Sequence, residues 1–347
     1  MSGTHPGATG SASDGLMADA ADFAADFATD FGAGEDPFWH PALFYDGEAE
    51  YLAGTVPFVA DGVAAGEPVA VAVPTWRLGT LRDAVAGRIG RGADGVHWLD
   101  MTEAGRNPGR IIPAVLREFA DRHPGRRVRI IGEPIWPSRS AAEYPACAQH
   151  EALINPAFTG RAVSILCPYD AGGLDPRVLD EAARTHPVLM DAAGTRASGH
   201  YAPDIVVDDH NEPLPDPAGP AERLHFDLAT LDAPRELAVR YATAAGVPER
   251  RVLDIELVVS ELTANSIRHG GGAGDLALWH DGAHLVVEVR DRGRLTDPLA
   301  GRRPVAPDTP GGRGLLLVNQ LSDLVRVHTG ADGTAVRAYF ATGGERG

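Results

Sequence analysis

Hydrophobic positions follow two different periods along the chain, and the period changes from one short segment to the next. Between residues 40 and 192, apolar and β-branched runs predict strands at 68–73, 96–99, 128–131 and 162–167. Patterns of helical period lie between them, at 51–65, 78–86, 111–121 and 143–153. Apolar strands separated by helices predict an α/β domain with a parallel sheet covered on both faces. Any ligand site is expected at the carboxyl ends of its strands.

A second α/β pattern begins at Leu224. Helices are predicted from Asp232 to about residue 245 and again from Pro248, and strands at 276–280, 285–290, 324–328 and 335–340. This order predicts a two-layer α/β sandwich over residues 222–347, preceded by a domain at 38–192. Between the two domains, residues 193–221 are rich in Asp, Glu and Pro, which predicts an extended acidic linker.

The first 37 residues are rich in Gly, Ser, Ala and Asp, a composition typical of a disordered acidic tail. Phe23, Phe27 and Phe31 recur every four residues and would share one face of a short helix. Two interpretations stay open for them: a docking segment that folds onto a partner, or a frayed tail with incidental helicity.

The most informative stretch lies near the end of a long helical pattern, at residues 260–270. Glu261 and Asn265 are one turn apart and share a face of that helix. A carboxylate there can orient or deprotonate a nucleophile, and an amide oxygen is a hard ligand suited to magnesium. The spacing alone is weak evidence, because it occurs by chance on many solvated helices.

Three elements follow this pair in a fixed order. A β-branched run ends at Asp291 and Gly293, where a carboxylate at a turn could accept a hydrogen bond from an exocyclic amine such as that of adenine. A glycine-rich loop at 311–314 runs directly into an apolar helix, an arrangement that lets bare backbone approach phosphates. Thr334, in a turn that opens the last strand, places a hydroxyl where it could support the same carboxylate.

Composition excludes several classes of function. The net charge of −17 argues against a nucleic-acid surface, and all 31 basic residues are arginine, which rules out a standard P-loop or a Schiff-base lysine. Cys147 and Cys167 are the only cysteines, and they have neither the CxxC spacing of a redox motif nor the ligand count expected for structural zinc. With no apolar run long enough to span a membrane, we expect a reduced, cytoplasmic protein.

Residues 224–341 resemble the ATP-binding (GHKL) domain shared by gyrase, a heat-shock chaperone, histidine kinases and MutL, and most of all the RsbW-type anti-sigma serine kinases. The resemblance implies ATP and Mg²⁺ as cofactors, Glu261 as general base and Asn265 as magnesium ligand. It further implies adenine recognition by Asp291 and the residues around it, and phosphate binding by the loop; the implied nucleotide contacts are Asn265, Asp291, Gly293, Gly312, Arg313, Gly314 and Thr334. One position departs from the family pattern, because Leu295 stands where a second glycine is usual.

Residues 40–189 resemble the MEDS sensory domain, a RecA-like α/β module without a P-loop. The resemblance implies a small-molecule signal and a pocket, for which the candidates are His40, Tyr45, Glu133, Trp136 and Tyr169. Each of these side chains has a second interpretation, since a lone histidine is often a hydrogen-bonded core residue and a tryptophan often serves packing alone.

Together the resemblances imply a cytoplasmic anti-sigma factor and serine/threonine kinase that phosphorylates an anti-sigma-factor antagonist, gated by its N-terminal domain. Its partners would be a sigma factor and that antagonist, and homodimers are common in the family. The Arg- and Pro-rich stretch 299–310 is expected to form a lid over the nucleotide. Two alternatives remain: a non-catalytic, nucleotide-dependent binding switch, and a sensor histidine kinase, for which Gln149-His150-Glu151 is a faint phosphoacceptor motif.

Overall fold

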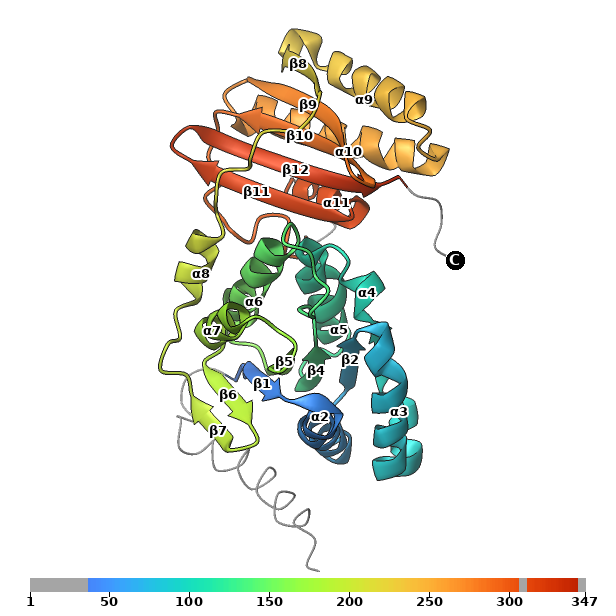
Figure 1. Ribbon diagram of the computed structural model, residues 1–347, viewed down its shortest axis with the longest axis vertical. Coiled ribbons are helices and arrows are strands. Elements are labelled where there is room, and N and C mark those ends of the chain that lie inside the picture. Colours follow the sequence, from blue (N-terminus) through green and yellow to red (C-terminus); the bar gives the residue numbers. More distant parts are fainter. Residues whose placement is uncertain (1–36, 306–310, 343–347) are drawn as a thin grey trace, which may run out of the picture.

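The computed structural model describes residues 37–305 and 311–342, which form two domains stacked end to end (Figure 1). The tail with its three phenylalanines and part of the expected lid, residues 306–310, lie outside the described residues. Within the described ranges, no helix is both long and apolar enough to cross a membrane.

The N-terminal domain is built on a seven-stranded sheet in the order β3-β2-β4-β5-β1-β6-β7. Its strands are β1 (Pro41–Tyr45), β2 (Val69–Val73), β3 (His97–Asp100), β4 (Val128–Gly132), β5 (Val163–Asp170), β6 (Val188–Asp191) and β7 (Gly194–Ala197). Every pairing is parallel except that of the edge strand β7 with β6. The parallel sheet predicted from the apolar runs is therefore confirmed.

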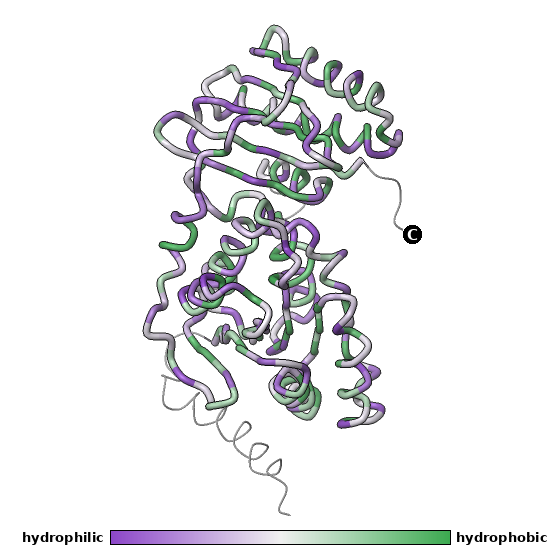
Figure 2. The backbone as a smooth tube through the Cα atoms, viewed as in Figure 1, coloured by the Kyte–Doolittle hydropathy of each residue, from purple (hydrophilic) through white to green (hydrophobic). Residues whose placement is uncertain are grey.

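Helices cover both faces of this sheet (Figure 1). They are α2 (Gly47–Ala64), α3 (Thr75–Ile89), α4 (Met101–Ala104), α5 (Arg117–Asp121), α6 (Tyr144–Phe158), α7 (Pro176–Thr185) and α8 (Pro203–Asp209). Because side chains alternate along a strand, Val69, Val71 and Val73 pack with α2 and α3. Ala70 and Ala72 face the other way and pack with the elements on the opposite face. In Figure 2 the central strands of this sheet are coloured mainly as hydrophobic.

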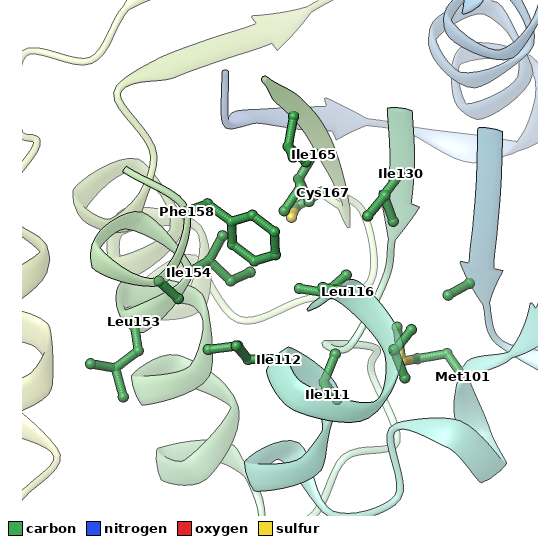
Figure 3. Packing of buried hydrophobic residues seen from close by; sticks show 14 of the residues in the cluster. Met101, Ile111, Ile112, Leu116, Ile130, Leu153, Ile154, Phe158, Ile165 and Cys167 are labelled. Carbon is green, nitrogen blue, oxygen red and sulfur yellow. The ribbon is translucent and has the colours of Figure 1, made fainter. Parts of the chain in front are cut away.

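The core on the α5–α6 face brings together residues far apart in sequence. Leu116, Ile154 and Phe158 pack there against strand residues such as Ile165 and Cys167 (Figure 3). A π-helical turn, Ile112–Leu116, precedes α5 within the segment expected to be one helix. It contains Pro113, which lacks the N–H that a regular helical ladder would require.

The C-terminal domain is a five-stranded antiparallel sheet in the order β11-β12-β10-β9-β8. Its strands are β8 (Glu222–Asp227), β9 (Ala273–Asp281), β10 (His284–Asp291), β11 (Leu324–Gly330) and β12 (Gly333–Ala341). The helices α9 (Asp232–Ala244), α10 (Glu249–His269) and α11 (Gly314–Leu321) pack on one face. The expected two-layer sandwich is confirmed.

The opposite face of this sheet packs against the N-terminal domain. Trp279, Val286 and Tyr339 are buried there in one cluster with Ala146 of α6. The connecting segment also lies on this domain, because Asn211 exchanges hydrogen bonds with the backbone of Thr329 on β11. The two domains are thus joined by a packed interface as well as by the chain.

Several elements were not expected from the sequence. The segment 193–221, predicted to be extended, contains the strand β7 and the helix α8, and β1, β6, α7 and β8 were not assigned. The missed strands are four to six residues long and flanked by proline or polar residues, so they carry few periods of alternation. Tertiary pairing with long central strands stabilises them instead.

Candidate functional site

The site is organised by α10, which places Glu261 and Asn265 opposite the start of α11. Both side chains lie against Gly314, the first residue of α11. A Cβ added at Gly314 would lie 2.7 Å from Glu261 Oε2 and 3.2 Å from Asn265 Nδ2. A side chain at Gly314 would therefore displace this carboxylate and crowd this amide. The glycine-rich loop and the Glu/Asn pair, about fifty residues apart in sequence, form one surface.

The loop before α11 needs glycine for its backbone. Gly311 and Gly312 have φ values of 81° and 75°, which lie in the left-handed region that other residues rarely adopt. This turn brings the chain to the N-terminus of α11, where unpaired backbone N–H groups and the helix dipole favour an anion. The local geometry therefore suits a phosphate beside the amide of Asn265.

Asp291, at the end of β10, forms the other end of the site. Its Oδ1 accepts a hydrogen bond from the backbone N–H of Gly293 at 2.8 Å. Its Oδ2 accepts one from the Ser266 hydroxyl at 2.7 Å. Ser266 was not singled out from the sequence, although it lies one residue beyond Asn265 on the last turn of α10. These two bonds fix the plane of the carboxylate while leaving it lone pairs for a further donor.

The turn after β10 is held against the end of α10. A Cβ at Gly293 would lie 2.3 Å from the carbonyl oxygen of His269, so this approach also requires glycine. Thr334, expected to support Asp291, instead donates its hydroxyl to the carbonyl of Gly293 at 2.9 Å. Because β12 pairs Thr334 with Asp291 in register, its side chain reaches the turn and not the carboxylate. Its support for Asp291 is therefore indirect.

A cavity of about 820 Å³ opens between these elements. Six predicted nucleotide contacts line it: Asn265, Asp291, Gly293, Gly312, Gly314 and Thr334. Glu261 and Arg313 lie outside this lining set, the former beside Gly314 and the latter directly before α11. Leu295 also lines the cavity, and no non-glycine residue in the described part of the chain has a positive φ. The backbone at Leu295 therefore does not require the glycine that is usual there.

The described part of the expected lid connects this cavity to the N-terminal domain. Gly301 lines the cavity, and its carbonyl accepts a hydrogen bond from Asn319 Nδ2 of α11 at 3.0 Å. Asn107 of the N-terminal domain in turn donates to the backbone carbonyl of Asn319 at 2.9 Å. Leu299 belongs to the apolar core of the N-terminal domain. The base of the lid is thus held from both domains.

Among the residues proposed for a sensory pocket, Tyr45 and Glu133 lie together at the carboxyl ends of β1 and β4. The hydroxyl of Tyr45 donates to Glu133 Oε1 at 3.1 Å, and that of Tyr51 donates to Oε2 at 3.4 Å. Arg77 donates to the Tyr45 hydroxyl and lies 3.6 Å from a carboxylate oxygen of Asp170. Burial raises the pKa of Glu133 to about 8, against the opposing effect of the nearby Arg77.

Replacing Glu133 with glutamine should remove a pH dependence of stability. A carboxyl whose pKa rises from 4.5 to about 8 on folding binds more protons in the folded state across that interval. As the pH rises from 4.5 to about 8, the unfolding free energy of the wild type should therefore fall by up to about 1.4 kcal/mol per pH unit relative to that of Glu133→Gln. Urea unfolding of both proteins at pH 5 and pH 8.5 measures the difference. Parallel pH profiles would show that the buried carboxyl is already ionised.

The other three pocket candidates lie apart from this network. Trp136 packs edge-on against Trp76, with the Arg139 guanidinium 3.9 Å from its ring centroid. His40 is fully buried beside His186, with ring centroids 4.1 Å apart, and the Tyr169 ring packs edge-on against the same His186. The structure thus divides the five candidates among three places.

Two family models match the chain. Residues 39–187 match the MEthanogen/methylotroph, DcmR Sensory (MEDS) domain, and residues 224–340 match the histidine kinase-like ATPase domain. The first match spans the N-terminal domain and the second spans the C-terminal domain. No curated protein sequence matches it significantly.

Three solved structures are each similar to about a third of the chain. The RsbU and RsbW domains of a Mycobacterium tuberculosis protein match at 19% identity, covering 35% of this chain and 32% of that chain, with a TM-score of 0.28. The SiaB–SiaC complex of Pseudomonas aeruginosa matches at 16% identity over 34% of this chain and 88% of that chain, with a TM-score of 0.27. The histidine kinase AdeS of Acinetobacter baumannii matches at 15% identity over 35% and 68%, with a TM-score of 0.21. This chain therefore spans about a third of the first of these structures.

Proposed function

We propose that this protein is an anti-sigma factor and serine/threonine kinase of the RsbW type, which binds Mg-ATP and phosphorylates an anti-sigma-factor antagonist. The observation that carries the proposal is the close packing of Glu261 and Asn265 around Gly314, at the N-terminus of α11 and beside the cavity that contains Asp291. The match of residues 224–340 to a kinase-like ATPase domain supports it.

The residues present suit a magnesium nucleotide. Asp291 would accept a hydrogen bond from the adenine amine, held in position by Ser266 and Gly293. The glycine loop would offer backbone N–H groups to phosphate oxygens, and Asn265 would provide a hard oxygen ligand for magnesium. Glu261 would orient and deprotonate the serine hydroxyl of the antagonist. Mg-ATP supplies the phosphoryl group, so the protein acts mainly by positioning and by neutralising charge.

Gating by the N-terminal domain would act through the lid. Arg302 is buried and Leu299 packs in the N-terminal core, so the described part of the lid cannot move away from the cavity without disturbing that domain. Arg106 also forms a 2.7 Å ion pair with Asp323, which in turn pairs with Arg251 on α10. A signal that shifts the N-terminal domain would therefore change both the lid and the helix that carries Glu261.

Removing the Asn107 side chain should weaken Mg-ATP binding although it touches no part of the cavity. Asn107→Ala leaves the buried backbone carbonyl of Asn319 without its hydrogen-bond donor, which costs about 1–3 kcal/mol. The same residue, Asn319, holds Gly301 through its side chain, so the substitution should loosen the base of the lid. We expect a several-fold rise in the Kd measured by calorimetric titration of the full chain. The control is Arg326→Ala, which removes an interdomain hydrogen bond to Ala142 away from the lid. Equal effects of the two substitutions would contradict coupling through the lid.

The two alternative functions make different chemical predictions. A binding switch would bind Mg-ATP without transferring phosphate. A histidine kinase would need an accessible phosphoacceptor, but His150 is 1% exposed and burial lowers its pKa to about 3. Its place inside α6 therefore disfavours that role.

The decisive experiment incubates the full chain with magnesium, ATP labelled on the γ-phosphate and a panel of purified anti-sigma-factor antagonists. Acid-stable label on an antagonist serine is the expected result, because phosphoserine survives acid and phosphohistidine does not. Acid-labile label on the chain itself would favour the histidine kinase. Saturable ATP binding with no transfer to any antagonist would favour the switch.

A further inference from the structure

A second cluster of reactive side chains lies inside the N-terminal domain, away from the nucleotide cavity. It consists of His40, Glu151, Cys167 and His186, which we call the His–Glu–Cys cluster. Their ligand atoms all lie within 4.8 Å of one another, and all four residues are buried to 1% exposure or less. They come from separate elements: the residue before β1, helix α6, strand β5 and the residue after α7. Figure 3 shows Cys167 in the packed core beside Ile165 and Phe158.

Hydrogen bonds outside the cluster set the orientation of both histidines. The amide nitrogen of Asn155 donates to the backbone carbonyls of Ala152 and Thr185, at 3.1 and 2.8 Å. Its oxygen is therefore the atom that faces His40 Nδ1 at 3.1 Å, and that nitrogen must carry the proton. In the same way, His186 Nδ1 lies 2.8 Å from the carbonyl oxygen of Ala182.

With both Nδ1 atoms protonated, the two Nε2 atoms present lone pairs to the centre of the cluster. Histidine ligands of metals commonly donate their other ring N–H to a carbonyl in this way, which fixes the tautomer and the ring. Asn155 and Glu151 lie one turn apart on α6, so the same helix face provides a carboxylate and the group that orients a histidine.

Within the described residues, the Glu151 carboxylate has only the other members of the cluster at ion-pair distance. Neither carboxylate oxygen of Glu151 has a hydrogen-bond partner in the described structure, and neither has His186 Nε2. A buried carboxylate that faces two lone pairs and a sulfur is costly unless a cation lies among them. This is the arrangement expected around a metal ion and not that of a satisfied polar core.

Three of the six distances between the ligand atoms fit a small tetrahedral ion. Glu151 Oε2 lies 3.2 Å from His186 Nε2 and 3.6 Å from His40 Nε2, and Cys167 Sγ lies 3.4 Å from His40 Nε2. A tetrahedron with bonds of about 2.0–2.3 Å, as zinc makes to nitrogen, oxygen and sulfur, has edges of about 3.3–3.6 Å. Nitrogen and thiolate ligands favour zinc and similar transition metals over calcium or magnesium.

We propose that the His–Glu–Cys cluster binds one tetrahedral transition-metal ion, Zn²⁺ by its ligand set, through His40 Nε2, Glu151, Cys167 Sγ and His186 Nε2. The ion ties the starts of β1 and β6 to β5 and to α6. Cys167 binds as a thiolate and loses its proton when the metal enters. Because α6 also carries Ala146, which packs on the ATPase sheet, metal occupancy fixes the helix that connects the two domains.

The test measures metal content and metal spectroscopy on the purified full chain. We expect about one equivalent of zinc by elemental analysis. After exchange for Co²⁺, we expect visible bands of a tetrahedral site and a near-ultraviolet thiolate-to-cobalt band. A folded wild-type protein that contains less than about 0.1 equivalent of any transition metal, and that gives no thiolate band with Co²⁺, would overturn the proposal. That result would mean that a buried histidine–glutamate ion pair fills the cluster.

The chain offers a matched control, because its other cysteine is equally buried. Cys147 lies on α6 in the apolar core, and its thiol donates a long hydrogen bond to the carbonyl of Pro134 at 3.9 Å. Cys147→Ser should keep the metal and the thiolate band. Cys167→Ser should lose the thiolate band, and its affinity for zinc should fall at least about tenfold. The same behaviour in both variants would refute the assignment of Cys167. If Cys167→Ser does not fold, the cobalt spectrum of the wild type still decides whether a thiolate binds the metal.

Discussion

Replacing Asn265 with alanine should weaken Mg-ATP binding by roughly 10- to 150-fold. The amide lies beside Gly314 and lines the cavity beside the phosphate loop, where it would bind magnesium and stand next to charged phosphates. Hydrogen bonds and ligands to charged groups contribute about 1.5–3 kcal/mol, which converts to that range. Calorimetric titration of the full chain with Mg-ATP measures the change.

Two variants on the same helix make this result specific. Asn265→Asp keeps an oxygen ligand for magnesium and should retain part of the affinity that alanine loses. Ser260→Ala removes a hydroxyl that bonds only to the backbone of its own helix, at Glu256, and should leave the Kd unchanged. If Asn265→Ala binds Mg-ATP as tightly as Ser260→Ala does, the nucleotide is not held at the Glu/Asn pair.

The sequence predicted those parts of the structure that depend on local pattern. Val69, Val71 and Val73 specify a buried strand by composition alone, and the spacing of Glu261 and Asn265 specifies a shared helix face. The glycine loop could also be predicted, because positive φ values restrict positions 311 and 312 to glycine. These features need no knowledge of what the chain does elsewhere.

Contacts between distant segments could not be predicted in this way. The approach of Gly314 to Glu261 and the bond from Ser266 to Asp291 exist only once α10, β10 and α11 are assembled. Thr334 was expected to support Asp291 directly, but strand register decides that its hydroxyl reaches Gly293 and not Asp291.

The N-terminal domain shows most clearly that sequence spacing does not predict contacts between distant segments. His40 and His186 are separated by almost the whole domain, and a search for metal motifs by spacing cannot connect them to Glu151 and Cys167. Parallel strands bring them together because β1 pairs with both β5 and β6. The Asn107–Asn319 contact between the domains could not be predicted from the sequence either, because over two hundred residues separate the two partners.

Replacing Glu261 with glutamine should lower phosphate transfer to the antagonist by about 100- to 10,000-fold, the usual contribution of a general base, while Mg-ATP binding stays within about twofold. The two effects separate because Glu261 lies outside the cavity lining, against Gly314, whereas Asn265 and Asp291 form the lining itself. Single-turnover transfer of labelled phosphate, measured beside calorimetric Kd values, provides both quantities.

Glu256→Gln is the matched control for this prediction, since it makes the same change on the same helix at a residue 3.6 Å from Arg235 and away from the cavity. It should transfer phosphate at the wild-type rate. Loss of transfer with intact binding in Glu261→Gln alone is expected of a kinase. If wild type and Glu261→Gln bind Mg-ATP alike, and an antagonist also binds both alike without acquiring phosphate from either, the protein works as a nucleotide-dependent switch. In that case the carboxylate beside Gly314 serves only to shape the loop.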